Sequence, residues 1–316
     1  MKHFVSHQSA LEYWRRFHKL PGRSEDRRYR VALPDKPSDI RLKVFSKFDL
    51  PVHVLIGNPD CRRTSKILKQ HVFSGETPVG CFINVGDGLM ISSPEFCFLQ
   101  LSDQLVLPEL IELGYEFCGS YSMPLADDPS VPERGFYNRP PLTSVAKLEV
   151  FLRSMPGTRG HQKAIRALRY LLDGSASPME TKLAMLLTLP KMLGGYGFSL
   201  PVLNKRVDLS KAEKAKFGRE FYVCDMLWPD KNIAVEYDSD QQHTGSNRIA
   251  SDSKRRNALA SLGIRVVSVT KLQLYNSVEL RRAAKTIARH MNKRLSLGNG
   301  FPAAHRELRK ELLGGF

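Results

Sequence analysis

The chain has 316 residues, and 42% of them are hydrophobic, so it is long enough to form two domains with buried cores. Its 48 Lys and Arg residues against 32 Asp and Glu residues give a net charge of +16 at pH 7. A charge of this size favours a polyanionic partner, nucleic acid ahead of an anionic membrane surface. The alternative is a basic surface that is simply solvated.

Two further classes of protein are disfavoured. No apolar run reaches the roughly 18–20 residues that span a bilayer, and the first residues lack the apolar centre of a signal peptide. The five cysteines form no CxxC pair, which argues against a disulfide framework and a cysteine zinc site. We therefore expect a reduced, cytoplasmic protein that does not cross a membrane.

The first half of the chain predicts a mixed α+β domain over residues 1–173. Its first helix should have Ser9 as N-cap, and Ser93-Pro94-Glu95 opens a later one. No catalytic set is recognisable in this half. The expected elements are helices over 9–20 and from 94 onward, strands at 52–56, 79–85 and 89–92, and a linker or long loop over 127–141.

The second half predicts the element order α-β-β-β-α-β-α, in a domain of residues 174–296 that is followed by a tail of residues 297–316. Ser177-Pro178-Met179-Glu180 opens the first helix, and Gly263 ends the second as a C′ glycine. The remaining expected elements are strands at 198–203, 220–227, 232–237 and 264–270, and helices at 249–262 and 277–294.

Two of these strands form a predicted hairpin in the segment FYVCDMLWPDKNIAVEYD. If its turn centres on Asp230-Lys231, Asp225 faces Glu236 with Cβ atoms about 4.5–5.5 Å apart, and alternation puts Asp238 on the same face as Glu236. Like charges directly opposite destabilise a bare sheet, whereas a cation between them turns the repulsion into ligation. Carboxylate oxygens suit Mg²⁺ or Mn²⁺, so Asp225, Glu236 and Asp238 are the predicted metal ligands.

An acid on one strand and an acid-x-polar tripeptide on the next, inside an α-β-β-β-α-β core, resemble the PD-(D/E)XK restriction-endonuclease-like superfamily. Residues 177–271 resemble the nuclease-like domains related to very-short-patch-repair endonucleases. The matching pieces are SPMETKLAMLL, YVCDMLWP, IAVEYDS, RIASDSKRRNALASLG and VVSVT. The first half resembles the antitoxin-like region of abortive-infection regulators, through PVHVLIG, HVFSG and MISSPEFCFLQLSD.

The resemblance assigns roles to individual residues. It makes Glu180 the acid carried by a helix, and Asp225 and Glu236 the central metal ligands. The lysine of the superfamily motif falls at Asp238, which can only bind metal or accept a proton. His243 is the candidate for acid/base chemistry, and Arg255 or Arg256 the candidate for the missing positive charge.

Each of these residues also has a structural interpretation. Glu180 suits the N-terminal end of a helix because the helix dipole favours an acid there. Asp225 can be a structural acid, Glu236 and Asp238 can form a solvated strand edge, and His243 can be an ordinary loop histidine. If no metal binds, the acids at Glu180, at Asp225 and at Glu236 with Asp238 each need a separate structural explanation. Because three independent explanations must then coincide, these acids together favour a metal site.

The last predicted helix carries the basic residues Arg281, Arg282, Lys285 and Arg289, which suit contacts to a phosphate backbone; a solvated basic face is the alternative. With Arg255 and Arg256 these form the predicted nucleic-acid-binding set. The leading hypothesis is a Mg²⁺-dependent or Mn²⁺-dependent endonuclease that cleaves double-stranded DNA, in defence or repair. The alternatives are an antitoxin-like regulator that binds DNA without cleaving it, and a protein-interaction module of a host-defence or toxin–antitoxin system.

Overall fold

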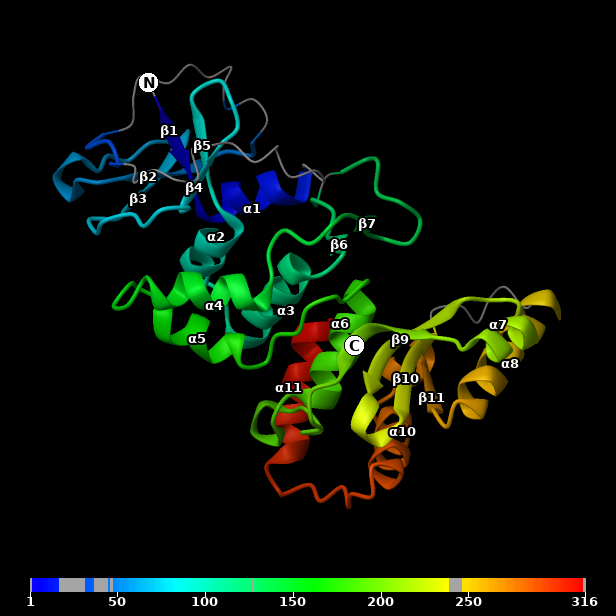
Figure 1. Ribbon diagram of the computed structural model, residues 1–316. Coiled ribbons are helices and arrows are strands. Elements are labelled where there is room, and N and C mark those ends of the chain that lie inside the picture. The colour runs from blue at the N-terminus through cyan, green and yellow to red at the C-terminus, as the bar shows by residue number, and fades with distance from the viewer. Residues whose placement is uncertain are drawn as a thin grey trace. The chain divides into compact units, whose positions relative to one another are not determined.

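The computed structural model describes residues 2–16, 32–36, 45, 48–126, 128–238 and 246–314, and for 246–252 the backbone alone. The chain divides into two compact units, Met1–Leu171 and Leu172–Phe316. Both contain helices and strands, so the protein is of the mixed α/β class, as the sequence predicts (Figure 1). No helix in these ranges is long and apolar enough to cross a membrane.

The first unit is built on a five-stranded mixed sheet in the order β3-β2-β1-β5-β4. The strands are β1 (His3–Val5), β2 (Val52–Ile56), β3 (Leu68–Val72), β4 (Phe82–Asn84) and β5 (Leu89–Ser92). The helices are α1 (His7–Arg16), α2 (Pro94–Leu101), α3 (Leu107–Cys118), α4 (Val145–Arg153) and α5 (His161–Leu168). Helix α1 packs on β2 and β5, and α2 contacts α3, α4 and α5.

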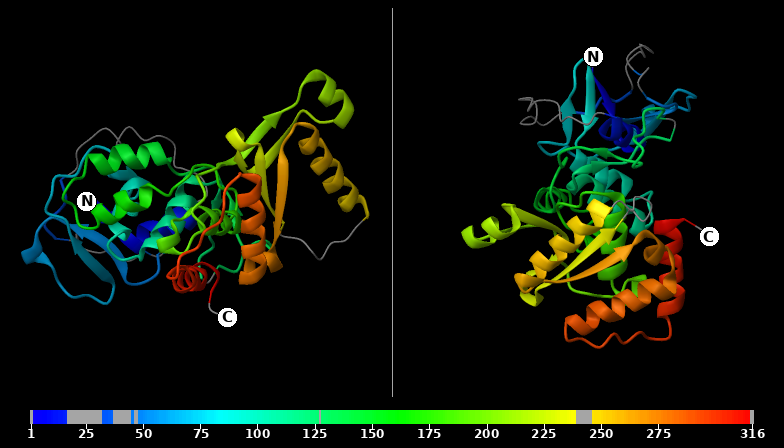
Figure 2. Two further views of the ribbon diagram at one scale, coloured as in Figure 1. Left: turned by 90° about the horizontal axis from the view of Figure 1, so that it is seen from below. Right: turned by 90° about the vertical axis from the view of Figure 1, so that its right-hand side faces the viewer.

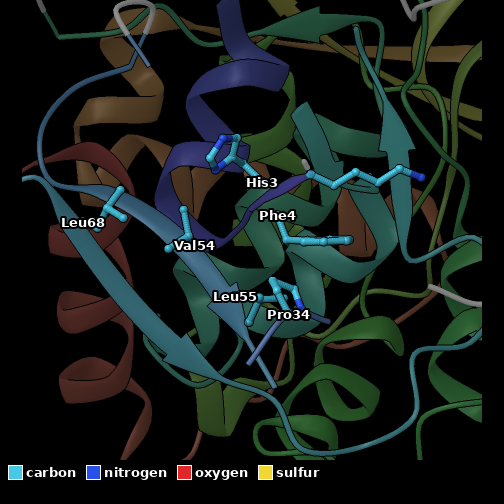
Figure 3. Close-up of a pocket in the computed structure, with 7 residues that line it drawn as sticks. His3, Phe4, Pro34, Val54, Leu55 and Leu68 are labelled. Carbon is cyan, nitrogen blue, oxygen red and sulfur yellow. The ribbon is translucent and has the colours of Figure 1, made fainter. Parts of the chain in front are cut away.

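The core of this sheet is tightly packed. The cavity beside β1, β2 and β3 has a volume of about 10 Å³, and its walls include His3, Val54 and Leu68 (Figure 3). A space of this size holds about one water molecule. It therefore offers no room for a ligand.

One prediction for the first unit is wrong. Ser9 does not cap α1; it is buried inside the helix, where its Oγ accepts a hydrogen bond from the backbone N–H of His53. Of the two alternatives for the Pro-rich segment, a linker or a long loop, the loop is confirmed: residues 128–136 lie within this unit, between β6 (Tyr121–Ser122) and β7 (Tyr137–Asn138). The short strands β1 and β3 were not expected from the sequence.

The second unit has a four-stranded sheet in the order β11-β10-β9-β8 (Figure 1). The strands are β8 (Val202–Asp208), β9 (Phe221–Trp228), β10 (Ile233–Asp238) and β11 (Arg265–Thr270). The first three form an antiparallel meander, and β11 runs parallel to β10. The helices are α6 (Pro178–Thr188), α7 (Lys211–Phe217), α8 (Ser246–Ser261), α9 (Lys271–Tyr275), α10 (Ser277–His290) and α11 (Phe301–Leu313).

The predicted hairpin forms in the predicted register. Ile233 pairs with Trp228 and Val235 with Met226, so the pairs are equidistant from Asp230-Lys231. The chain turns through a 3₁₀ turn (Pro229–Lys231) and Asn232, which has a left-handed φ of 53°. One core cluster of this unit joins β9, β10 and α8 through buried residues such as Cys224, Ala234 and Leu259.

Other elements of the second unit differ from the prediction. Strand β8 begins at Val202 and not at 198, and the short helix α7 was not expected. Residues 301–313, expected as part of a tail, form α11, which packs on α6 and on the turn Lys191–Leu193. Its buried residues Phe301, His305, Leu308 and Leu312 recur at helical spacing, so the segment has an apolar face to cover.

Candidate active site

The acids predicted on the hairpin lie where the strands β9 and β10 run side by side. Val235↔Met226 is the last regular pair, and the next pair in this register is Glu236 with Asp225. The backbone N–H of Tyr237 donates a hydrogen bond of 2.8 Å to Asp225 Oδ2. The Asp225 carboxylate therefore points across to β10 within the sheet.

Helix α6 brings a third acid to the same place. Ser177 caps α6 by accepting from the N–H of Glu180, and its hydroxyl donates to Glu180 Oε1 at 2.9 Å. Glu180 Oε2 accepts from the backbone N–H of Ala176 at 3.1 Å and from Asn204 Nδ2 at 2.8 Å. Glu180 thus has the structural role of an N-terminal helix acid, and it also contributes negative charge beside the hairpin.

Asn204 on β8 is a site residue that sequence reasoning missed. The pairs Leu203↔Met226 and Lys205↔Cys224 flank it, so it lies opposite Asp225 in the sheet. Its φ is 44°, a left-handed conformation that Asn tolerates better than most residues. Its side chain bridges the Gly174 carbonyl and Glu180. The predicted strand ends at 203, and the sequence carries no signal for Asn204, because its place opposite Asp225 follows from the register of β8 with β9.

The two hairpin acids are electrostatically strained. The pKa of Asp225 is raised to about 7, chiefly by burial and also by the nearby charges of Glu236 and Glu180, while the Tyr237 N–H and Arg255 oppose the rise. Burial also raises the pKa of Glu236, with Glu180 adding to the rise and Arg255 opposing it. Both residues therefore hold a negative charge less readily than a free carboxyl group.

Arg255 on α8 compensates part of this charge. Its Nη2 donates to Glu236 Oε2 and to the carbonyl oxygen of Val223. Glu236 Oε1, the other oxygen, is buried and has no hydrogen-bond partner of normal geometry among the described residues; the Cys224 thiol is close enough to Glu236 to lower the pKa of its carboxyl group but does not meet that geometry. Burial removes water from a carboxylate oxygen, and this costs free energy when no hydrogen bond replaces the water. A hydrogen-bond donor or a cation bound at this oxygen would therefore stabilise the site.

The remaining predicted residues lie elsewhere or outside the description. Asp238 is exposed at the end of β10, next to Thr270 in the parallel register with β11. His243 falls outside the described residues. Arg256 is exposed on α8. The side chains of Arg281, Arg282, Lys285 and Arg289 are exposed on α10, whose buried face includes Leu280, Ala284 and Ile287.

The residues present fit a cation that is held by two carboxylates. Within the described ranges, no group of three or more His, Cys, Asp or Glu side chains is arranged to hold a metal ion. Mg²⁺, however, usually keeps several waters and takes only one or two carboxylates together with substrate phosphates. The facing pair of Asp225 and Glu236, with its unpartnered Oε1, matches that donor set.

Comparisons with known proteins do not assign a function to this chain. No family model and no solved structure matches the chain. Two uncharacterized proteins of Mycobacterium tuberculosis, from strains CDC 1551 / Oshkosh and ATCC 25618 / H37Rv, are each 29% identical to it over 164 residues. The match covers 48% of this chain and 55% of each relative, so the chain spans about half the length of the curated relatives that it matches.

Proposed function

We propose that the second unit is a divalent-metal-dependent DNA phosphodiesterase of the PD-(D/E)XK type. The observation that carries the proposal is the buried Glu236 Oε1, which has no hydrogen-bond partner in the described part of the chain, beside Asp225, whose pKa is raised by burial and by two other acids. Clustered acids that oppose one another's charge are typical of functional sites, because folding alone gains nothing from them. The meander followed by a parallel strand is compatible with the core that such nucleases use.

Asp225 and Glu236 are the residues that would hold Mg²⁺ or Mn²⁺. When bound, the cation supplies a water of lowered pKa and positive charge beside the scissile phosphate. Arg255 holds Glu236 through Oε2, which leaves Oε1 in place for the cation. Glu180, fixed by Ser177 and Asn204, adds negative charge that a divalent cation would offset. Arg256 is an exposed cation of α8 that is available to a phosphate oxygen.

The second candidate is a DNA-binding regulator that does not cleave. Two observations favour it. Arg255 already occupies one oxygen of Glu236, and Asp238 stands where the superfamily has a lysine. The proposals differ in what they require of the acids: cleavage needs Asp225 and Glu236, whereas binding to a polyanion gains nothing from them.

A plasmid-nicking assay with Mg²⁺, Mn²⁺ or EDTA distinguishes the two. The wild type should nick with metal and not with EDTA, and Asp225→Asn and Glu236→Gln should each abolish nicking. In EDTA, Asp225→Asn should melt at the same temperature as the wild type or higher, because it removes a charge that burial and Glu236 oppose. Glu220→Gln, a matched change at an exposed acid beside β9, should keep full activity.

The nuclease proposal fails if the wild type shows neither nicking nor an increase in melting temperature on titration with Mn²⁺. Duplex binding without cleavage, unchanged in Asp225→Asn and Glu236→Gln, would establish the regulator instead. Equal loss of activity in Glu220→Gln would show that the effect of the charge changes is not specific to the site.

A further inference from the structure

The second unit has a large cavity that is separate from the hairpin acids. It has a volume of about 680 Å³, and its walls come mainly from the start of α10 and the length of α11. These two helices follow one another through the 291–300 connection (Figure 2). Small-molecule sites typically have volumes of about 300–1,000 Å³. We call it the α10–α11 cavity.

The walls of the α10–α11 cavity are strongly cationic. Arg281 comes from α10, and Arg306, Arg309 and Lys310 come from α11. No Asp or Glu lines the cavity, and no ion pair among the described residues engages any of the four cations. Four like charges around one space repel one another unless an anion lies between them.

One of these cations is fixed in place. Arg309 donates from Nη1 to the carbonyl oxygen of Leu274 at 2.9 Å and from Nη2 to that of Tyr275 at 2.7 Å. The carbonyl groups orient the guanidinium without neutralising it. An oriented arginine loses less conformational entropy when it binds an anion, and its planar fork suits phosphate oxygens.

The cavity also has an aromatic side. The rings of Tyr196, Phe301 and His305 form a cluster, with centroids 5.4 Å apart for Tyr196 and Phe301 and 4.9 Å apart for Phe301 and His305. Tyr275 and the exposed Val278 add further apolar surface. Burial raises the pKa of Tyr196 to about 12 and lowers that of His305, so both rings favour their neutral forms. The three clustered rings are themselves buried, so a planar ring in the cavity would contact the half-buried ring of Tyr275 and the exposed Val278.

We propose that the α10–α11 cavity binds a nucleoside polyphosphate, with its base on the aromatic side and its phosphates between Arg281, Arg306, Arg309 and Lys310. A ligand of this class joins a planar ring, which can contact the aromatic side of the cavity, to several negative charges, which can contact its cationic side. The site is distinct from the proposed nuclease centre, and the inference does not depend on that function. It also separates Arg281 from Arg282, Lys285 and Arg289, which do not line the cavity.

The test is calorimetric titration of the full-length protein with ATP, adenosine, pyrophosphate and a single-stranded oligonucleotide. ATP should bind, and adenosine and pyrophosphate should each bind about tenfold more weakly or worse, because each lacks one half of the contacts. Arg306→Glu/Lys310→Glu should weaken ATP binding by about tenfold or more, since charged hydrogen bonds become repulsions. Both residues are exposed, and an unchanged melting temperature checks the fold.

Lys211→Glu/Lys214→Glu, a matched double charge reversal at exposed residues of α7 outside the cavity, should leave ATP affinity unchanged. The proposal is overturned if ATP does not bind, or if pyrophosphate binds as tightly as ATP. Equal weakening by Lys211→Glu/Lys214→Glu would assign the effect to the overall positive charge. Preferential binding of the oligonucleotide in the cavity would replace the nucleotide with nucleic acid. Each of these results sinks the proposal.

Discussion

Three histidines of the first unit lie in contact in the sheet and at the start of α1. The ring of His7 stacks on that of His71 with centroids 3.7 Å apart, and His71 Nε2 lies 3.2 Å from His53 Nδ1. Burial, together with the charge of Lys69, lowers the pKa of His53 to about 4. Burial also lowers the pKa of His71 to about 4, with His53 and Lys69 adding to the effect. Each ring is held neutral in the folded protein.

This arrangement predicts acid sensitivity of the first unit. Between the ordinary pKa of 6.5 and about 4, the unfolded chain binds more protons at these rings than the folded chain. Their contribution to stability is complete above 6.5 and is lost as the pH falls toward 4. The melting temperature should therefore drop over this range. It should drop less in His71→Phe, which keeps a ring against His7 but cannot be protonated.

His290→Gln is the control, because His290 lies on α10 outside the cluster. Its melting temperature should follow the wild type at every pH. An identical drop in His71→Phe and the wild type would show that the cluster does not cause the acid sensitivity.

At the scale of elements, the β9–β10 hairpin determines which acids meet. Pro229–Lys231 forms a 3₁₀ turn, and Asn232 follows in the left-handed region at φ 53°. The carbonyl oxygen of Asn232 accepts from the N–H of Arg265, so the turn is also tied to the entry of β11. Any change that shifted this turn by one residue would move Glu236 to the opposite face of the sheet.

Substitutions at Asn232 should measure this constraint. Asn232→Val should lower the free energy of unfolding by about 1–2 kcal/mol, because a β-branched residue is strained at positive φ. Asn232→Gly should be close to neutral, since glycine adopts this conformation without strain. Urea denaturation of the two variants and the wild type checks the prediction. Equal stability of the Val and Gly variants would contradict the view that backbone conformation at this residue maintains the hairpin.

For the whole molecule, the net charge of +16 is the property that bears on its partner. A protein that neutralises several phosphates releases counterions, so its affinity for duplex DNA should fall steeply as salt increases. On a plot of log affinity against log salt, each phosphate contributes about −0.9 to the slope. We predict a slope of several units, reduced by about 1 in Arg282→Gln if that side chain contacts a phosphate.

Fluorescence anisotropy with a labelled duplex across a salt series provides the measurement. An affinity that stays constant from about 50 to 200 mM salt would rule out binding through the phosphate backbone. It would leave the positive charge as a property of the solvated surface.

Features that depend on neighbours in the chain were determined by the sequence alone. Ser93 and Ser177 cap α2 and α6, Gly263 has the left-handed φ of a C′ residue, and the hairpin adopts the register set by its turn. In each case the hydrogen bonds form within a few residues, so residue type and spacing determine them. The mixed α/β class follows from the same local patterns.

Features that join distant segments were decided only by the tertiary structure. Strand β1 pairs with β5, Asn204 donates a hydrogen bond to Glu180, and Arg255 donates one to a single oxygen of Glu236. Ser9 lies inside α1, where its hydroxyl oxygen accepts a hydrogen bond from the backbone of β2, the strand that begins at Val52. The α10–α11 cavity likewise combines Tyr196 with residues beyond 300. Such contacts form between residues that are far apart in the sequence. They depend on which surfaces of the helices and sheets pack together, because burial and electrostatic interactions act between side chains that are close in space.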